Sequence, residues 1–475
     1  MKKQVFNPYL PLHEYVPDGE PRVFEGRVYI YGSHDEAGGT IYCPGHYVSW
    51  SAPVDDLSDW RYEGVSYRRT QDPSNPEDKL QLWAPDVVKG TDGRYYLYYC
   101  FRFYPEIGVA VSDSPAGPFE FYGHIHYADG RVLNEHLPFD PAVLVDDDGR
   151  VYLYYGFAPK PIFHPDFPPI VPSPGCMVTE LEADMVTAKG EAKMCAPGVV
   201  HAEGTGFEGH AFFEAASMRK INGTYYLVYS SQLSHELCYA TSSYPDRDFV
   251  YGGTIVSNGD VGLNGRTDAV NMTGNNHGGL VEINGQWYVF YHRQTHATES
   301  SRQGCAQPVT ILPNGSVPQV EITSCGLNGG PLAGAGEYSA GYVCHLTAGR
   351  ELGKIIFGQD LKESLPHIFE EAEDLHYVAN ITDGVTFGWK YFAFEGPTKL
   401  SLVLRSRGEG VLAVYTGEPK TGAEPIAEIA VFAGDEALWQ TTEPVTCQLN
   451  GTLPIYIRYA GSGALDVKTL VLSGK

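Results

Sequence analysis

The sequence predicts an all-β protein, a five-bladed β-propeller followed by a β-sandwich of jelly-roll type. Three observations lead to this prediction: a short Tyr-rich phrase occurs five times, turn residues precede most of its copies, and the last third of the chain changes to short alternating strands. The chain contains 33 Tyr and 54 Gly, which favours strands joined by tight turns. Its 475 residues are too many for one ordinary core, so we expect two domains.

The repeated phrase starts with glycine and continues into apolar and aromatic residues. Its copies are GRVYIYGSHD, GRYYLYY, GRVYLYY, GTYYLVYS and GQWYVFYHR, starting at Gly26, Gly93, Gly149, Gly223 and Gly285. A turn followed by such a run is typical of a hairpin. The mean spacing of about 65 residues suits a four-stranded propeller blade with loop insertions. We therefore expect five blades over residues 1–323. The alternative, a β-sandwich with coincidental hairpins, does not explain the constant order of turn, glycine and strand.

The C-terminal third has a different pattern. Residues 324–342 are rich in glycine and small residues, which indicates a linker or packing segment that we place at 324–365. Residues 366–475 contain the short strands KLSLVLRS, GVLAVYTG, PIAEIAVF, LPIYIRYAG and ALDVKTLVL. Short strands separated by turns predict a β-sandwich.

Charge and composition exclude several partners. The formal net charge of −25 would repel nucleic acid and anionic membranes but is indifferent to a neutral ligand. The nine cysteines show no CxxC pair, so they indicate reduced thiols and neither disulfides nor zinc. The first residues lack the apolar region of a signal peptide, and no run could span a bilayer, which predicts a cytoplasmic protein.

Each predicted blade carries an ionisable residue at the same level. These residues lie seven to nine positions before the repeat glycines, where each innermost strand should face the central channel; they are Asp18, Asp86, Asp140, Glu214 and His277. Any one of them could cap a loop. Carboxylates crowded at one axis raise the pKa of at least one of them and cost stability, so four carboxylates and a histidine in register favour a function.

Hydrolysis of a glycosidic bond needs several carboxyl groups close together. One carboxylic acid protonates the leaving oxygen, and an opposite carboxylate acts as base or nucleophile. A third carboxylate can keep the acid protonated by like-charge repulsion. Aromatic neighbours that could stack on a neutral sugar are Trp83, Phe139, Phe212 and Phe213.

The sequence resembles glycoside hydrolase family 43 over roughly residues 6–325. The matching segments include NPYLP, VPDGEPRVFEGRVYIYGSHD, LWAPDVVKGTDGRYYLYY, FDPAVLVDDDGRVYLYYG, FFEAASMRKINGTYYLVYSS and NNHGGLVEINGQWYVFYHR. The resemblance implies a five-bladed propeller that acts with inversion on arabinose- and xylose-containing glycans.

The resemblance also implies the catalytic roles. Asp18 falls on the general base, although Gly19 stands where the family usually has proline, so Glu20 is the alternative base. Asp140 falls on the aspartate that orients the acid and modulates its pKa. Glu214 falls on the general acid, with Glu208 and Glu203 as local alternatives.

Further positions are assigned by the same resemblance. His277 matches a fifth-blade histidine that often lies beside a bound calcium or a water cluster, and a buried neutral histidine is the alternative. Arg293 matches an arginine that contacts the substrate, unless it forms a salt bridge at a strand end. Further candidates for the substrate pocket are His34, Asp35, Trp83 and Phe139. The reaction itself requires no cofactor.

The C-terminal domain resembles a family 6 carbohydrate-binding module over about residues 366–475, through FEEAEDL and LPIYIRYAGSGALDVKTLVL. Trp389 and Tyr391 are then possible sugar platforms. The alternative is a sandwich that only supports the propeller or shapes the rim of its pocket.

We therefore expect an inverting exo-glycosidase that releases terminal α-L-arabinofuranosyl residues from neutral oligosaccharides. A β-D-xylosidase, or an enzyme with both activities, is the first alternative. A retaining fructan hydrolase would need an aspartate that NPYLP does not supply. A propeller that binds sugar without cutting it would be expected to lose one of the three carboxylates, and all three are present.

Overall fold

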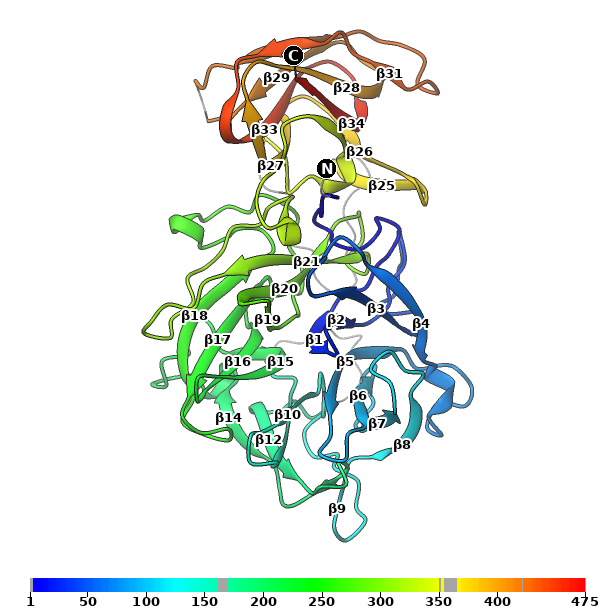
Figure 1. Cartoon of the computed structure of the whole chain (residues 1–475), viewed down its shortest axis with the longest axis vertical. Helices are drawn as coiled ribbons and strands as arrows, with labels where there is room; N and C mark the ends of the chain where they lie inside the picture. The colour runs from blue at the N-terminus through cyan, green and yellow to red at the C-terminus, as the bar shows by residue number, and fades with distance from the viewer. Residues whose placement is uncertain (1–2, 161–169, 350–351, 354–364, 421, 475) are drawn as a thin grey trace.

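A computed structural model describes residues 3–160, 170–349, 352–353, 365–420 and 422–474. These residues form two all-β domains, a propeller and a smaller sandwich packed against one side of it (Figure 1). Within the described ranges the helical elements are short 3-10 turns: η1 (Arg69–Gln71), η2 (Val199–His201), η3 (Leu263–Gly265), η4 (Gly326–Asn328) and η5 (Ala340–Tyr342). None of the described helices is long and apolar enough to cross a membrane.

Five sheets, antiparallel except where β13 (Thr187–Ala188) pairs with β9 (His126–Tyr127), surround the channel of the propeller, which confirms the predicted five blades. The first blade is β1 (Glu20–Phe24), β2 (Arg27–Tyr31), β3 (Tyr47–Pro53) and β4 (Arg61–Tyr67), and the second is β5 (Leu82–Lys89), β6 (Tyr95–Phe101), β7 (Ile107–Ser112) and β8 (Glu120–His124). The third blade is β10 (Ala142–Val145), β11 (Val151–Tyr155), β12 (Gly175–Leu181) and β14 (Lys193–Pro197), extended by β13 (Thr187–Ala188) and β9 (His126–Tyr127). The fourth is β15 (Phe212–Ile221), β16 (Thr224–Ser231), β17 (Glu236–Ser242) and β18 (Val250–Ser257), and the fifth is β19 (Leu280–Ile283), β20 (Gln286–Gln294) and β21 (Arg302–Val309).

The Tyr-rich phrase forms the second strand of every blade. Each repeat glycine lies in the turn before that strand with φ between 75° and 88°, a left-handed conformation that glycine adopts without strain. The tyrosines that follow are buried between neighbouring blades; Tyr98, Tyr99, Tyr154 and Tyr229 are fully inaccessible. The repeat therefore supplies both the hairpin turn and the core of each blade.

The N-terminal segment closes the ring on the three-stranded fifth blade. The backbone N–H of Asn7 donates to the Ser324 carbonyl (3.0 Å), and that of Tyr9 donates to the Gly304 carbonyl (3.2 Å). The Asn7 side chain exchanges two hydrogen bonds with the backbone of Ala306. The start of the propeller is thus fixed to its last blade, which brings Asp18 beside that blade.

The second domain is a sandwich of two sheets. One sheet contains β22 (Leu332–Ala333), β24 (His345–Ala348), β27 (Val385–Glu395), β29 (Gly410–Tyr415), β30 (Ala427–Val431) and β33 (Asn450–Gly461). The other contains β23 (Gly336–Ser339), β25 (His367–Ala372), β26 (Leu375–Ile381), β28 (Thr398–Ser406), β31 (Gln440–Thr441), β32 (Val445–Cys447) and β34 (Leu465–Gly474). The segment predicted as a linker, 324–365, differs from that expectation because it contributes β22, β23 and β24, while its residues 350–351 and 354–364 lie outside the described residues.

The two residues considered as sugar platforms are not exposed on the sandwich. Trp389 is fully buried in the sandwich core and donates its indole N–H to the Ser339 carbonyl (3.1 Å). The Tyr391 hydroxyl donates to Glu321 of the propeller (2.7 Å). Trp389 therefore stabilises the sandwich core, and Tyr391 connects the sandwich to the propeller. The resemblance to a carbohydrate-binding module stays a prediction.

Candidate active site

Three carboxylates lie where inner strands begin at the mouth of the channel. Asp18 and Asp140 come directly before β1 and β10, with positive φ of 56° and 48°. Glu214 lies in β15 at an irregularity of its pairing with β16, followed by Ala215 at φ 66°. Left-handed residues and bulges redirect side chains and are frequent at functional sites. These backbone features turn all three carboxylates toward one site.

Asp140 lies next to Glu214. Its Oδ2 accepts a hydrogen bond from the backbone N–H of Ala215 (3.1 Å). Burial, followed by the charges of Glu214 and Asp18, raises the pKa of Asp140 well above its usual range. This environment disfavours ionisation of both neighbouring carboxyl groups at once, so the pair can share a proton.

Asp18 has the opposite electrostatic environment. Burial opposes its ionisation, but Arg302 and His292 outweigh burial and hold the pKa of Asp18 far below its usual range. The Arg302 Nη1 donates to Asp18 Oδ1 (2.9 Å), and His292 Nδ1 lies 3.2 Å from the same oxygen. Asp18 is therefore ionised at neutral pH, whereas the surroundings of Asp140 raise its pKa.

Arg302 is the functional residue that the sequence reasoning missed. Its Nε and Nη2 donate to the two oxygens of Asp35 (2.8 and 3.1 Å), and its guanidinium lies over the Tyr42 ring at 4.7 Å. Asp35, predicted to bind substrate, therefore orients Arg302 and acts on Asp18 through it. The sequence feature that could have identified Arg302 is the fifth hairpin, in which Arg302 pairs with Gln294 at the end of β20.

The structure does not bring Arg293 to the carboxylates. Side chains alternate along a strand, so His292 faces Asp18 while Arg293 faces the other side of β20. There Arg293 donates to the Val343 carbonyl (3.3 Å) and to Asn271 Oδ1 (3.2 Å). Its contacts tie the fifth blade to the segment leading into the sandwich.

Aromatic side chains form one wall beside the carboxylates. Trp83 and Phe139, both predicted pocket residues, meet edge to face at 5.4 Å between ring centroids. Phe103, Phe157 and Phe213 extend this buried cluster. The Trp83 indole N–H is buried and has no hydrogen-bond partner among the described residues, so it is a donor that a sugar hydroxyl could satisfy.

His34 lies apart from this wall. It is half-buried, with Nδ1 3.2 Å from the His46 carbonyl. It lines a cavity of about 370 Å³ together with Asp35 and with Glu370 of the sandwich. His34 is thus placed at the junction of the two domains.

The alternative carboxylates have other partners. Glu20 is buried deeper in the channel, where it pairs with Arg219 and accepts a hydrogen bond from Ser217 (3.0 Å). Asp86 forms a bidentate contact with Arg22. Glu203 and Glu208 are exposed, and Glu208 accepts from the Gly204 N–H. The positions of these groups favour Asp18 as base and Glu214 as acid.

His277 lies at the channel beside the carboxylates. Its Nδ1 is 3.6 Å from Asp140 Oδ2, and burial lowers its pKa to about 4, so the ring is neutral at neutral pH. Calcium takes six to eight oxygen ligands, and His277 belongs to no group of three metal-binding side chains among the described residues. A calcium ion here would depend mainly on water ligands, so calcium binding stays a prediction.

Arg302→Gln is expected to move the acid limb of the pH–rate profile of kcat/KM upward by at least about one pH unit. Without the cation, burial raises the pKa of Asp18, so Asp18 becomes protonated and inactive at a higher pH than in the wild type. Arg302→Lys keeps the charge and should shift the limb less. An unchanged acid limb in folded Arg302→Gln, checked by circular dichroism, would contradict the role of Arg302.

Comparison with known proteins shows the family to which this chain is similar. The model of "Glycosyl hydrolases family 43" matches residues 14–317. A "Xylosidase/arabinosidase" of Thermoclostridium stercorarium is 46% identical over 485 residues, covering 99% of both chains. "Xylosidase/arabinosidase 43A" of Humicola insolens is 33% identical over 309 residues, covering 58% of this chain and 88% of its own.

Solved structures share the fold. A family 43 β-xylosidase/α-arabinofuranosidase from a compost microbial metagenome, in complex with xylotriose and in a calcium-free form, is 30% identical with a TM-score of 0.50; the match covers 66% of this chain and 96% of the other. A family 43 arabinoxylan arabinofuranohydrolase from Bacillus subtilis, in complex with cellotetraose, covers 99% of this chain and 97% of its own with a TM-score of 0.52. At 22% identity, this second likeness concerns the fold alone.

Proposed function

We propose that this chain, which belongs to glycosyl hydrolase family 43, releases single terminal sugars from arabinose- and xylose-containing oligosaccharides with inversion. The chain is a glycoside hydrolase by its family. One observation carries the finer proposal: at one channel mouth, the pKa of Asp18 is lowered while that of Asp140, beside Glu214, is raised. A base and an acid poised together at neutral pH are what hydrolysis of an acetal needs.

In the proposed reaction, Glu214 donates a proton to the glycosidic oxygen as the bond to the anomeric carbon breaks. Asp18 removes a proton from the water that attacks the opposite face of the sugar. Asp140 orients Glu214, and the repulsion between the two carboxylates opposes ionisation of both, so that a proton stays available to Glu214. Arg302 fixes the Asp18 carboxylate and keeps it ionised before each turnover.

We propose a terminal α-L-arabinofuranosyl group as the preferred substrate and a β-D-xylosyl group as the second. The two sugars can place their ring oxygen and hydroxyls similarly, so one pocket can accept both. The names of these relatives combine the two activities. They therefore support both substrates without indicating which of the two is preferred. The Trp83–Phe139 wall offers an apolar face for either sugar.

The test is a pair of substrates, 4-nitrophenyl α-L-arabinofuranoside and 4-nitrophenyl β-D-xylopyranoside. We expect hydrolysis of both, with the larger kcat/KM on the arabinofuranoside. A larger value on the xyloside would establish the alternative, a β-xylosidase. Proton NMR of the first product should show the inverted anomer before mutarotation. Retained configuration would overturn the mechanism, and no hydrolysis with measurable sugar binding would favour a non-catalytic propeller.

A further inference from the structure

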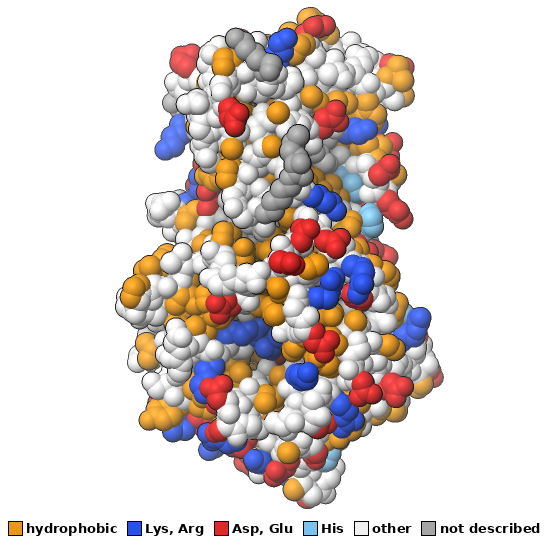
Figure 2. Space-filling view, viewed as in Figure 1, with side chains coloured by type: hydrophobic (Ala, Val, Ile, Leu, Met, Phe, Trp, Pro, Cys, Tyr) orange, Lys and Arg blue, Asp and Glu red, His pale blue; other side chains and the backbone are white. Residues whose placement is uncertain are grey.

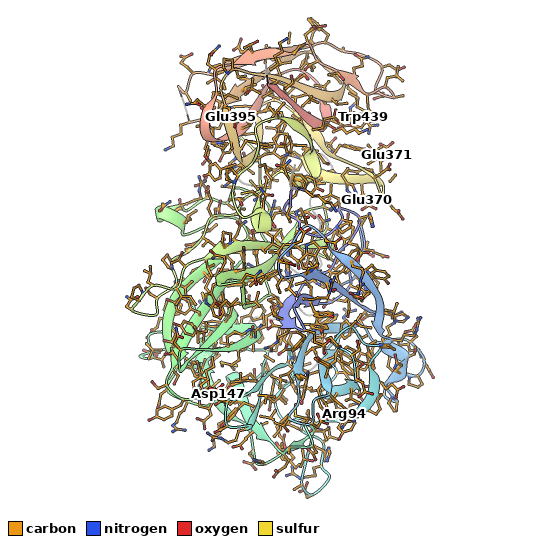
Figure 3. The ribbon with its side chains drawn as sticks, viewed as in Figure 1. Arg94, Asp147, Glu370, Glu371, Glu395 and Trp439 are labelled. Carbon is orange, nitrogen blue, oxygen red and sulfur yellow. The ribbon has the colours of Figure 1, made fainter. Side chains whose placement is uncertain are left out.

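A second group of chemically matched side chains lies at the junction between the propeller and the sandwich. One donor atom from each of His296, Glu370 and His376 lies within 4.8 Å of the others. His296 follows β20 of the fifth blade, whereas Glu370 and His376 face each other across β25 and β26 in the strand register. Figure 3 shows Glu370 at the side of the sandwich that meets the propeller, and Figure 2 shows histidine side chains in the same region.

The hydrogen bonds around His296 fix which ring nitrogen carries the proton. The Gln303 amide N–H donates to the Leu12 carbonyl (2.6 Å), so its Oε1 accepts from the Thr295 hydroxyl (2.6 Å). The Thr295 oxygen, 3.1 Å from His296 Nδ1, must then accept the Nδ1 proton. His296 Nε2 therefore presents a lone pair.

His376 has a free lone pair as well. Its Nε2 lies 3.1 Å from the Glu373 carbonyl, which can only accept, so Nε2 carries the proton. Its Nδ1 is buried and has no hydrogen-bond partner among the described residues, and the side chain is only 3% exposed. A buried acceptor without a partner costs free energy.

The cluster of His296, Glu370 and His376 therefore has more hydrogen-bond acceptors than protons available to satisfy them. The Tyr15 hydroxyl lies 2.9 Å from His296 Nε2 and donates to Glu370 Oε2 (2.5 Å). Its single proton can satisfy only one of these two acceptors. A cation would satisfy the remaining lone pairs. The other group of three potential metal ligands, His210, Glu236 and Cys238, has no such surplus, because Glu236 accepts from His210, Ser231 and Thr254.

We propose that His296, Glu370 and His376 bind a zinc ion that joins the sandwich to the propeller. Two neutral imidazoles and one carboxylate suit zinc, with a water or a further oxygen completing four ligands. Thr295 and Tyr15 would orient the ligands through hydrogen bonds, as outer partners do in metal sites. The cavity of about 370 Å³ lined by Tyr15, His34 and Glu370 borders the cluster on its Glu370 side.

The zinc ion would also stabilise the surroundings of the catalytic base. The Tyr15 carbonyl accepts the backbone N–H of Asp35 (2.9 Å), and Asp35 holds Arg302 against Asp18. An ion that fixes Tyr15 and Glu370 would therefore restrain both the domain interface and this ion pair. Binding, however, does not depend on the proposed hydrolysis, and its test needs no substrate.

The experiment uses the full-length protein, treated with chelator, dialysed and titrated with zinc chloride by calorimetry. We expect one zinc ion per chain and a melting temperature that rises with zinc concentration. Cobalt(II) should give the visible absorption of a four-coordinate site.

Glu370→Gln should weaken zinc binding at least about tenfold. The matched control is Glu371→Gln, because the neighbouring Glu371 is exposed and pairs with Arg405 (3.2 Å) instead of the cluster. His376→Gln is a second test should Glu370→Gln fail to fold. No stoichiometric zinc in the wild type, or equal affinity in Glu370→Gln and Glu371→Gln, would overturn the proposal.

Discussion

Glu214→Gln is expected to lower kcat/KM about 10³-fold on an oligosaccharide substrate, because the amide cannot protonate the leaving oxygen. The loss should shrink as the leaving group improves, since a nitrophenolate or dinitrophenolate departs with little help from an acid. The measurement is kcat/KM for a series of aryl glycosides and one unactivated disaccharide. A dependence on leaving-group pKa that is steeper than in the wild type identifies the acid.

The matched control is Glu208→Gln. Glu208 lies close in sequence to Glu214 and was its local alternative, but it is exposed and bonds to the Gly204 backbone. It should retain wild-type activity on every substrate. Full activity of folded Glu214→Gln on the disaccharide, or loss of activity in Glu208→Gln, would reassign the acid.

The sequence predicted the fold well because the propeller repeats itself. Each repeat glycine occupies a turn that needs positive φ, and each Tyr-rich run packs against the next blade, so local chemistry repeats with the architecture. The 324–365 segment carries no such repeat. Its strands β22 to β24 are two to four residues long and exist through pairing with β27 and β34, which local composition does not reveal.

The sequence predicts those site residues whose role depends on their position along a strand. It does not predict those whose role depends on the direction of the side chain. Asp18, Asp140 and Glu214 share a level before or within inner strands, and counting along the chain finds them. Arg302 acts through a contact between residues 284 positions apart in sequence, and only the folded hairpin shows it. The alternation of side chains along β20 places Arg293 and His292 on opposite faces of the strand, and this follows from the sequence once the strand is recognised.

Asp18→Asn is expected to reduce kcat/KM by about 10³-fold or more on all leaving groups alike, because water must be deprotonated whichever bond breaks. Asparagine is close in size and can still accept the hydrogen bond from Arg302 Nη1, so binding of the product sugar should be nearly unchanged. The measurement combines the aryl glycoside series with a calorimetric Kd for arabinose or xylose. For the base variant, the loss of kcat/KM should be the same for every aryl glycoside. For the acid variant, the loss should depend on the leaving group, and this difference separates the two roles.

The alternative base provides the control. Glu20 pairs with Arg219 and Ser217 deeper in the channel, so Glu20→Gln should keep most of the activity at temperatures below its unfolding transition. Its unfolding temperature should fall, because Arg219 loses a buried partner. Activity retained in Asp18→Asn but lost in folded Glu20→Gln would transfer the role of base to Glu20. The opposite result would show that the left-handed turn at Asp18, with Gly19 after it, still delivers the carboxylate to the attacking water.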